Sequence, residues 1–255
     1  MEKNSQKKSA LIYILTLLLL VAVTMACYYI FSAPYNSKKF RYAGFGIYMP
    51  FNYSIHGIDV SHYQSVINWQ DVKQMEFNNI KIGFAFIKAT EGIDKVDENY
   101  IQNWYEAKLM NIPVGAYHFF YSGINGNAQA QNFIEIVNLE KNDLPPVLDV
   151  EQDNGTSDAD LQKEIQDWLD AIEKNYHVKP IIYTNIDFYE DHLEGKFDNY
   201  LLWIANYLKT DKPDIGRDWV FWQHSESGHA NGIGGYVDFN VFNGDSLAFQ
   251  NLLIK

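Results

Sequence analysis

The chain has 255 residues, of which 47% are hydrophobic and 20% are charged, a composition typical of a folded globular protein. Its formal net charge of −12 argues against a nucleic-acid partner, because phosphate backbones are bound through clusters of lysine and arginine. The single cysteine, Cys27, excludes an intramolecular disulfide and any metal site built from several thiolates.

The N-terminal segment is strongly apolar. No charged residue occurs between Leu11 and Phe31, and three lysines precede this run. Because about 20 apolar residues suffice for a helix to cross a bilayer, residues 1–31 are predicted to form a cytoplasmic tip and a transmembrane anchor. A lipoprotein signal ending at Cys27 and an ordinary cleaved signal peptide are the alternatives.

The next segment, residues 32–55, is rich in aromatic side chains. These side chains either pack on the following domain or form an aromatic belt at a membrane surface. Packing is predicted for the later half of the segment. The aromatic residues are Tyr35, Phe40, Tyr42, Phe45, Tyr48, Phe51 and Tyr53.

From residue 56 to residue 255, short β-branched or aromatic runs alternate with helical stretches. The clearest helix is predicted over residues 158–175, with Ser157 as its N-cap. Alternating strands and helices imply a parallel sheet, and eight strands imply a closed β/α barrel. The predicted strands are Gly57–Ser61, Ile82–Lys88, Val114–Phe120, Val147–Glu151, Ile181–Thr184, Leu201–Ala205, Val220–His224 and Tyr236–Phe239.

The last three connections between these strands lack good helical patterns. The prediction for the fold class is therefore α/β, an irregular TIM-like barrel of eight strands with about five helices, preceded by the N-terminal transmembrane helix. An open doubly wound sheet is the alternative. No glycine-rich phosphate-binding loop follows any predicted strand, which disfavours that alternative.

Three of the predicted strands carry an aspartate at or near the C-terminal end of an apolar run. These residues are Asp59, Asp149 and Asp238. In β/α barrels the active site is built at the C-terminal ends of the strands, so the three carboxyl groups are expected to meet at one rim. An aspartate inside an apolar strand is costly to bury unless it is paired or functional.

Asp149 and Glu151 form a candidate acid pair, because residues two apart on a strand point to the same face. Two close carboxylates raise each other's proton affinity, so one of them can stay protonated near neutral pH. Cleavage of a glycosidic bond needs one group that protonates the leaving oxygen and another that supports an oxocarbenium-like centre. Glu151 is the predicted general acid, and Asp149 is predicted to stabilise charge or orient a substrate group.

A series of short motifs, in this order along residues 56–245, resembles glycoside hydrolase family 25, the N-acetylmuramidases or lysozymes. The resemblance implies hydrolysis of the β-1,4 bond between N-acetylmuramic acid and N-acetylglucosamine, on an irregular β/α barrel. The motifs are GIDVS (57–61) with Gln64, FIKATEG (86–92), GAYHF (115–119), LDVE (148–151), IYTN (182–185), LWIA (202–205), WQ (222–223) and VDFN (237–240).

The resemblance also implies an acidic quartet and a retaining reaction assisted by the acetamido group of the substrate. No cofactor is expected, and no metal ion, because the chain contains no recognisable metal-binding motif. In this chain the quartet falls on Asp59, Asp149, Glu151 and Asp238, with Glu151 as the acid. Four further residues match positions that line the sugar groove, and filling of the barrel interior is the alternative role for each. They are Tyr117, Tyr183, Trp203 and Gln223.

Glu91 and the histidines near Asp59 are predicted to have structural roles rather than roles in catalysis or metal binding. Glu91 is predicted to form a salt bridge with Lys88 rather than to reach the cleft. His56 and His62 flank Asp59, but their spacing matches no metal-binding motif, so hydrogen-bonding roles are predicted for them.

The predicted protein is a membrane-anchored muramidase of the bacterial cell envelope, with its catalytic domain outside the cytoplasm and glycan strands of peptidoglycan as its partner. A non-catalytic peptidoglycan-binding protein is one alternative. A metal-dependent polysaccharide deacetylase on a similar barrel is another. The oligomeric state is not predicted by any feature of the sequence.

Overall fold

The computed structural model describes residues 16, 19–21, 23–25, 41–42, 44–50 and 52–255. The chain divides into two compact units, residues 1–40 and residues 41–255. Most of the predicted span between Leu11 and Phe31 lies outside the described residues. Among the residues that are described, no helix combines the length and the hydrophobicity needed to cross a bilayer. The transmembrane anchor therefore stays a prediction.

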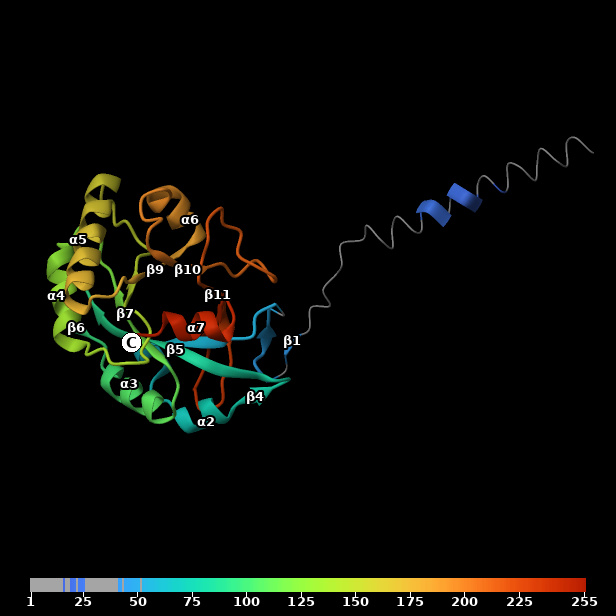
Figure 1. Cartoon of the computed structure of the whole chain (residues 1–255), viewed down its shortest axis with the longest axis horizontal. Coiled ribbons are helices and arrows are strands. Elements are labelled where there is room, and N and C mark those ends of the chain that lie inside the picture. The colour runs from blue at the N-terminus through green and yellow to red at the C-terminus, as the bar shows by residue number, and fades with distance from the viewer. Residues whose placement is uncertain (1–15, 17–18, 22, 26–40, 43, 51) are drawn as a thin grey trace, which may run out of the picture. The chain divides into compact units, whose positions relative to one another are not determined.

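The unit from residue 41 onward is built on a closed barrel of eight strands (Figure 1). Pairing of the first and last strands of the ring, β3 with β5, closes the barrel and excludes the open doubly wound sheet. Around the ring the strands are β3 (His56–Val60), β12 (Val237–Phe242), β11 (Phe221–Gly228), β10 (Leu201–Ala205), β9 (Ile181–Asn185), β8 (Val147–Asp149), β7 (Val114–Phe119) and β5 (Ile80–Glu91). Two short strands, β4 (Glu76–Phe77) and β6 (Lys95–Val96), pair with β5.

The barrel departs from the predicted all-parallel arrangement at one strand. β12 runs antiparallel to both of its neighbours, β11 and β3, whereas the other neighbours in the ring are parallel. The cause lies in residues 229–236, which join β11 to β12 through turns and irregular backbone without a helix. A parallel partner needs a crossover of a dozen or more residues, so a connection this short can only return the chain antiparallel.

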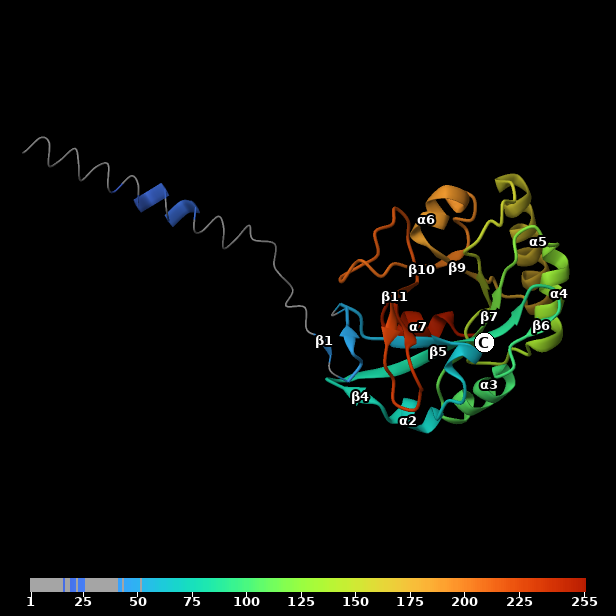
Figure 2. The same ribbon diagram turned by 180° about the vertical axis from the view of Figure 1, so that it is seen from behind.

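The helices lie on the outside of the ring of strands, as Figures 1 and 2 show for α3, α4 and α5. The longest, α5, begins at the predicted cap, where the Ser157 side chain accepts a hydrogen bond from the Asp160 backbone N–H. From residue 41 onward the helices are α2 (Trp69–Gln74), α3 (Tyr100–Leu109), α4 (Gly126–Ile136), α5 (Asp158–Tyr176) and α7 (Ser246–Leu252), with the shorter η1 (His62–Gln64), α6 (Ile186–Phe188) and η2 (Tyr189–Leu193).

The segment just before the barrel packs against it, as predicted for the later half of residues 32–55. Its strands β1 (Arg41–Tyr42) and β2 (Ile47–Tyr48) pair antiparallel. Phe45 and Met49 are almost completely buried, and the Phe45 ring meets the Phe239 ring of β12 edge to face at 5.4 Å. Tyr35, Phe40 and Phe51 lie outside the described residues.

Large aromatic side chains fill the interior of the barrel. Phe86 of β5 stacks on Trp203 of β10, with ring centroids 4.4 Å apart. Phe249 of α7 contacts Phe84 and Phe242 and completes the same buried cluster. A solid interior of this kind is typical of eight-stranded barrels, in which side chains rather than a pore occupy the centre.

Candidate active site

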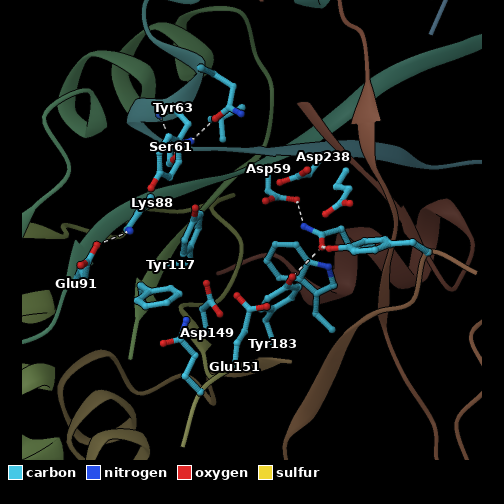
Figure 3. Close-up of a pocket in the computed structure, with 18 of the residues that line it drawn as sticks. Asp59, Ser61, Tyr63, Lys88, Glu91, Tyr117, Asp149, Glu151, Tyr183 and Asp238 are labelled. Atoms are coloured by element: carbon cyan, nitrogen blue, oxygen red, sulfur yellow. Dashed lines mark hydrogen bonds and ion pairs between the residues drawn. The ribbon is translucent and has the colours of Figure 1, made fainter. Parts of the chain in front are cut away.

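The four predicted carboxyl groups line one cavity of about 500 Å³ (Figure 3). Asp59 comes from β3, Asp149 is the last residue of β8, and Glu151 follows two residues later. Asp238 differs from the prediction, because it is the second residue of β12 rather than a residue at the end of a strand. Since β12 is antiparallel, its beginning lies at the same rim as the ends of its parallel neighbours, and Asp238 pairs directly with Asp59 in the register.

Asp59 and Asp238 are hydrogen-bonded to each other and share a proton. Burial and the neighbouring Asp59 charge raise the pKa of Asp238 to about 9, so Asp238 is protonated at neutral pH. Burial also raises the pKa of Asp59, although hydrogen bonds from Asn240, Gln223 and Asp238 favour its carboxylate. Of the two carboxyl groups, Asp59 is therefore the one whose ionised form the surrounding hydrogen bonds favour.

The raised pKa of Asp238 has a consequence for stability. Asp238 is ionised in the unfolded chain at pH 8 but protonated in the folded one, so its contribution to stability falls as pH rises from about 4 towards 9. Asp238→Asn is expected to raise the free energy of unfolding at pH 8 by about 0.5–2 kcal/mol, and by much less at pH 4. Urea denaturation at both pH values measures this difference, with exposed Asp211→Asn as the control. An equal effect at the two pH values would contradict the raised pKa.

Asp149 and Glu151 form the second carboxyl pair, side by side in the cavity (Figure 3). Strand β8 ends at Asp149, but the Val150 N–H still donates to the Tyr183 carbonyl at 2.9 Å, so the extended backbone continues and both side chains face the cavity. Burial, the Glu151 charge and a hydrogen bond to Glu151 raise the pKa of Asp149 well above its usual range. Burial also raises the pKa of Glu151, helped by the Asp59 charge and opposed by the hydrogen bond from Asp149.

Burial and the neighbouring Glu151 charge therefore favour the protonated form of Asp149 in the substrate-free protein. The second oxygen of Asp149, Oδ1, is buried and has no hydrogen-bond partner among the described residues. A buried acceptor without a partner is costly. A ligand N–H that reached this oxygen would stabilise the Asp149 carboxylate and transfer the Asp149 proton to Glu151.

Gln223 connects the barrel tyrosines to Asp59. Its Oε1 accepts hydrogen bonds from the Tyr183 hydroxyl at 2.8 Å and the Tyr207 hydroxyl at 2.6 Å. Because both lone pairs of that oxygen are used, the amide nitrogen must face Asp59, and Nε2 donates to Asp59 Oδ2 at 2.8 Å. Gln223 therefore holds the Asp59 carboxylate in place.

A second chain of hydrogen bonds reaches the same oxygen of Asp59. Trp203 Nε1 donates to Asn240 Oδ1 at 2.8 Å, and Asn240 Nδ2 donates to Asp59 Oδ2 at 2.7 Å. Trp203 is only 2% exposed, so its principal contacts are with the barrel interior and with Asn240. Two amide donors on one carboxylate oxygen favour the charged form of Asp59.

One end of the cavity carries an ion pair. The Lys88 Nζ lies 2.6 Å from Glu91 Oε2, which confirms the predicted salt bridge, and the exposed Lys95 Nζ lies 2.9 Å from Glu91 Oε1. The Tyr121 hydroxyl donates to the same Glu91 oxygen. Burial alone would raise the pKa of Glu91, but hydrogen bonds from Lys88, Tyr121 and Lys95 lower it to about 2. Glu91 also lines the cavity, so its pairing with Lys88 does not remove it from the cleft.

All four residues predicted to contact sugar line the cavity, namely Tyr117, Tyr183, Trp203 and Gln223. The structure adds residues that the sequence analysis did not select. Tyr207 lies in the irregular segment after β10, where no periodicity marks it. Asn240 could have been selected from the sequence, because it lies two residues after Asp238 on one strand and therefore faces the same side as Asp238. Asn240 contacts Asp59 without lining the cavity, whereas Tyr63, Tyr121 and Glu226 line it, as do Lys88 and Glu91.

The two histidines that flank Asp59 have protein partners. His56 Nε2 lies 2.9 Å from the Tyr53 carbonyl oxygen, and His62 Nδ1 lies 2.9 Å from Asp97 Oδ2. Within the part of the chain that the structure describes, no group of three or more histidine, cysteine, aspartate or glutamate side chains is arranged to hold a metal ion.

Comparison with known families gives a match over most of the barrel. The model of a family described as "Glycosyl hydrolases family 25" matches residues 58–233 and ends before β12, which carries Asp238. Uncharacterized protein YegX of Escherichia coli K12 is 44% identical over 200 residues, which cover 78% of this chain and 74% of that protein. Lysozyme M1 of Streptomyces globisporus is 31% identical over 207 residues, which cover 75% of this chain and 69% of that protein.

Solved structures give a similar result. A family 25 glycosyl hydrolase from Bacillus anthracis matches with a TM-score of 0.74 and 35% identity, covering 80% of this chain and 95% of that one. A bacterial lysozyme from Streptomyces coelicolor matches with a TM-score of 0.70 and 31% identity, covering 78% of this chain and 96% of that one. These matches agree with the irregular eight-stranded barrel described above.

Proposed function

The chain belongs to glycosyl hydrolase family 25, and from this membership we propose that it is an N-acetylmuramidase. It would cleave the β-1,4 bond between N-acetylmuramic acid and N-acetylglucosamine in peptidoglycan. The main support is the cavity lined by two carboxyl pairs, Asp149 with Glu151 and Asp59 with Asp238, in which the pKa values are raised. The similarity to Lysozyme M1 supports the same substrate class.

In the proposed reaction Glu151 is the general acid. Its pKa is raised by burial and by the Asp59 charge, which favours a protonated carboxyl group at neutral pH. Glu151 donates its proton to the glycosidic oxygen as the bond to the anomeric carbon breaks, so the leaving sugar departs as a neutral alcohol. The resulting Glu151 carboxylate then takes a proton from the water that completes hydrolysis.

Asp149 would orient the acetamido group of the muramic acid residue. The free Oδ1 atom of Asp149 can accept the acetamido N–H, which directs the carbonyl oxygen towards the anomeric carbon. That oxygen forms a bond to the anomeric carbon as the leaving oxygen departs, and water later displaces it, which retains the configuration. The negative charge of Asp149 stabilises the positive charge that develops on the acetamido group.

The Asp59–Asp238 pair would set the pH range of the reaction. Asp59 raises the pKa of Glu151, and the acid must be protonated to act, so activity is lost as pH rises through that pKa. Removing the charge of the pair with Asp59→Asn/Asp238→Asn is expected to lower the pKa of Glu151. The alkaline limb of the profile of kcat/KM against pH should therefore move to lower pH.

The single variant Asp59→Asn provides the comparison for this prediction. In Asp59→Asn the neighbouring charge no longer raises the pKa of Asp238, although burial still does, so Asp238 ionises more readily than in the wild type and restores part of the negative charge of the pair. The single variant should therefore shift the limb less than the double variant. Identical profiles for the wild type and the double variant would refute the proposed electrostatic role.

Mass spectrometry of peptidoglycan digested by the purified chain tests the function itself. A muramidase releases fragments with N-acetylmuramic acid at the reducing end. Release of acetate without new reducing ends would instead indicate a deacetylase. Binding to peptidoglycan without any change in its fragments would indicate a non-catalytic binding protein.

We also propose that residues 56–255 form the catalytic domain and that residues 1–31 anchor it to the membrane of a bacterial cell, with the domain outside the cytoplasm. The uncharged run from Leu11 to Phe31 supports the anchor. Residues 32–55 would join the two parts. Recovery of the full chain in the soluble fraction after cell lysis would contradict the anchor.

A further inference from the structure

A second hollow adjoins the catalytic cavity. It has a volume of about 320 Å³, within the roughly 300–1,000 Å³ typical of pockets for small ligands. Tyr207 and Glu226 line both the hollow and the catalytic cavity, so the two lie next to each other. One wall of the hollow is formed by residues 46–48 and Pro50, which precede the family match at residues 58–233. This wall therefore lies outside the segment that the family model matches.

The wall is fixed to the barrel by several contacts. Phe45 packs against Phe239, and its carbonyl oxygen accepts a hydrogen bond from the His229 N–H at 2.8 Å. Gly46 has a φ of +70°, a conformation that allows the chain to turn into β2. Ile47 is then buried, as is Met49. The wall is held in place before any ligand arrives, which lowers the entropic cost of binding.

The alternation of these side chains directs Tyr48 to the hollow. Successive residues of an extended segment point to opposite sides, so burial of Ile47 and Met49 leaves Tyr48 on the open side. Tyr48 is 47% exposed and Tyr207 is 43% exposed, so two partly exposed tyrosine rings line the same hollow. Flat aromatic faces with a hydroxyl group at one edge suit sugar rings, which have apolar C–H faces and polar edges.

The polar groups of the hollow also favour a sugar over a charged peptide. Burial lowers the pKa of His224 to about 3, so its ring is neutral at neutral pH. The Lys209 ammonium is paired with Asp214 at 2.7 Å. Among the described residues no salt bridge engages Glu226, so an acidic peptide would meet a repelling carboxylate here. Hydroxyl groups complete the lining, from Thr210, Ser225 and Ser227.

We propose that Tyr48 and Tyr207 form an additional glycan subsite, which binds a sugar unit of the strand at a distance from the bond that is cut. This inference rests on the proposed function, because it concerns the same glycan. It predicts that the segment before the barrel extends the binding groove, so that longer strands bind more tightly than short ones.

The test is calorimetric measurement of the binding of peptide-free peptidoglycan tetra-, hexa- and octasaccharides to the full chain carrying Glu151→Gln, which prevents cleavage. Affinity is expected to rise by about tenfold once the oligosaccharide is long enough to reach the hollow, and Tyr48→Ala should remove that rise. A tenfold change corresponds to about 1.4 kcal/mol. Tyr48→Phe, which keeps the ring, should retain the rise.

Two further variants control for folding and for loss of an exposed aromatic ring. Tyr48→Gln should lose the rise as Tyr48→Ala does, since it keeps a polar side chain but not the ring. Tyr105→Ala removes a 63% exposed tyrosine on α3, away from the hollow's lining, and should leave the rise intact. One outcome would refute the subsite alone: the Tyr48→Ala chain binds the octasaccharide as tightly as the Glu151→Gln chain with Tyr48 intact, and the tetrasaccharide also binds. The proposed function would then stand. Absence of binding at every length would refute both.

Discussion

Replacing Glu151 by glutamine is expected to lower kcat on peptidoglycan by about 10³-fold, within the roughly 10²–10⁴-fold range attributed to general acid catalysis. Glutamine has nearly the same shape as glutamate, but it has no acidic proton to donate to the leaving oxygen. The appearance of new reducing ends during digestion measures the loss. KM should change little, because the side chain still fills its place in the cavity.

A change of leaving group separates loss of the acid from loss of structure. An oligosaccharide that carries a nitrophenol in place of the leaving sugar needs no protonation, so Glu151→Gln should cleave it nearly as fast as the wild type. Exposed Glu190→Gln, which makes the same chemical change on the short helix η2, is the matched control and should behave as wild type on both substrates. A Glu151→Gln chain with full activity on peptidoglycan would remove Glu151 from the mechanism.

Replacing Asp149 by asparagine is expected to lower kcat by about 10²–10³-fold on both substrates, because it removes the charge that stabilises the acetamido intermediate. This step does not depend on the leaving group, so a nitrophenol leaving group should not restore activity. The contrast between the two variants assigns their roles. If the nitrophenyl substrate restored Asp149→Asn and failed to restore Glu151→Gln, the assignments of acid and orienting residue would be exchanged.

The control for Asp149→Asn is a measurement of its free energy of unfolding. Asp149 is buried and its pKa is raised by that burial, so a neutral asparagine replaces a group whose neutral form the folded protein already favours. The free energy of unfolding at neutral pH should therefore stay the same or rise. A loss of activity accompanied by loss of the folding transition would count against a catalytic role.

Much of the barrel could be predicted because its elements have local signatures. The apolar stripe of α5, its Ser157 cap and its helical length are encoded within a single stretch of residues, and the structure reproduces them. β3 and β10 begin and end within one residue of the predicted ranges. β8 is shorter than predicted, since the Asp149–Glu151 pair lies where the strand leaves the sheet to reach the cavity.

The direction of β12 could not be predicted from its own residues. An apolar run with an aspartate has the same period whichever way the strand runs, because direction depends on the neighbours with which it pairs. The sequence analysis placed Asp238 at a strand end, whereas in the structure it lies at a strand beginning. Asp238 still reached the predicted rim because β12 runs opposite to its neighbours.

The sequence by itself determined the succession of strands and helices, the family resemblance and the four carboxyl residues, since each of these depends on residue type and local spacing. Only the tertiary structure decided that Asp59 and Asp238 share a proton, that Gln223 joins two tyrosines to Asp59, and that residues 46–50 form a wall beside the cavity. These features arise from contacts between residues far apart in the chain. Their geometry and burial, which set the pKa values, exist only once the barrel has closed.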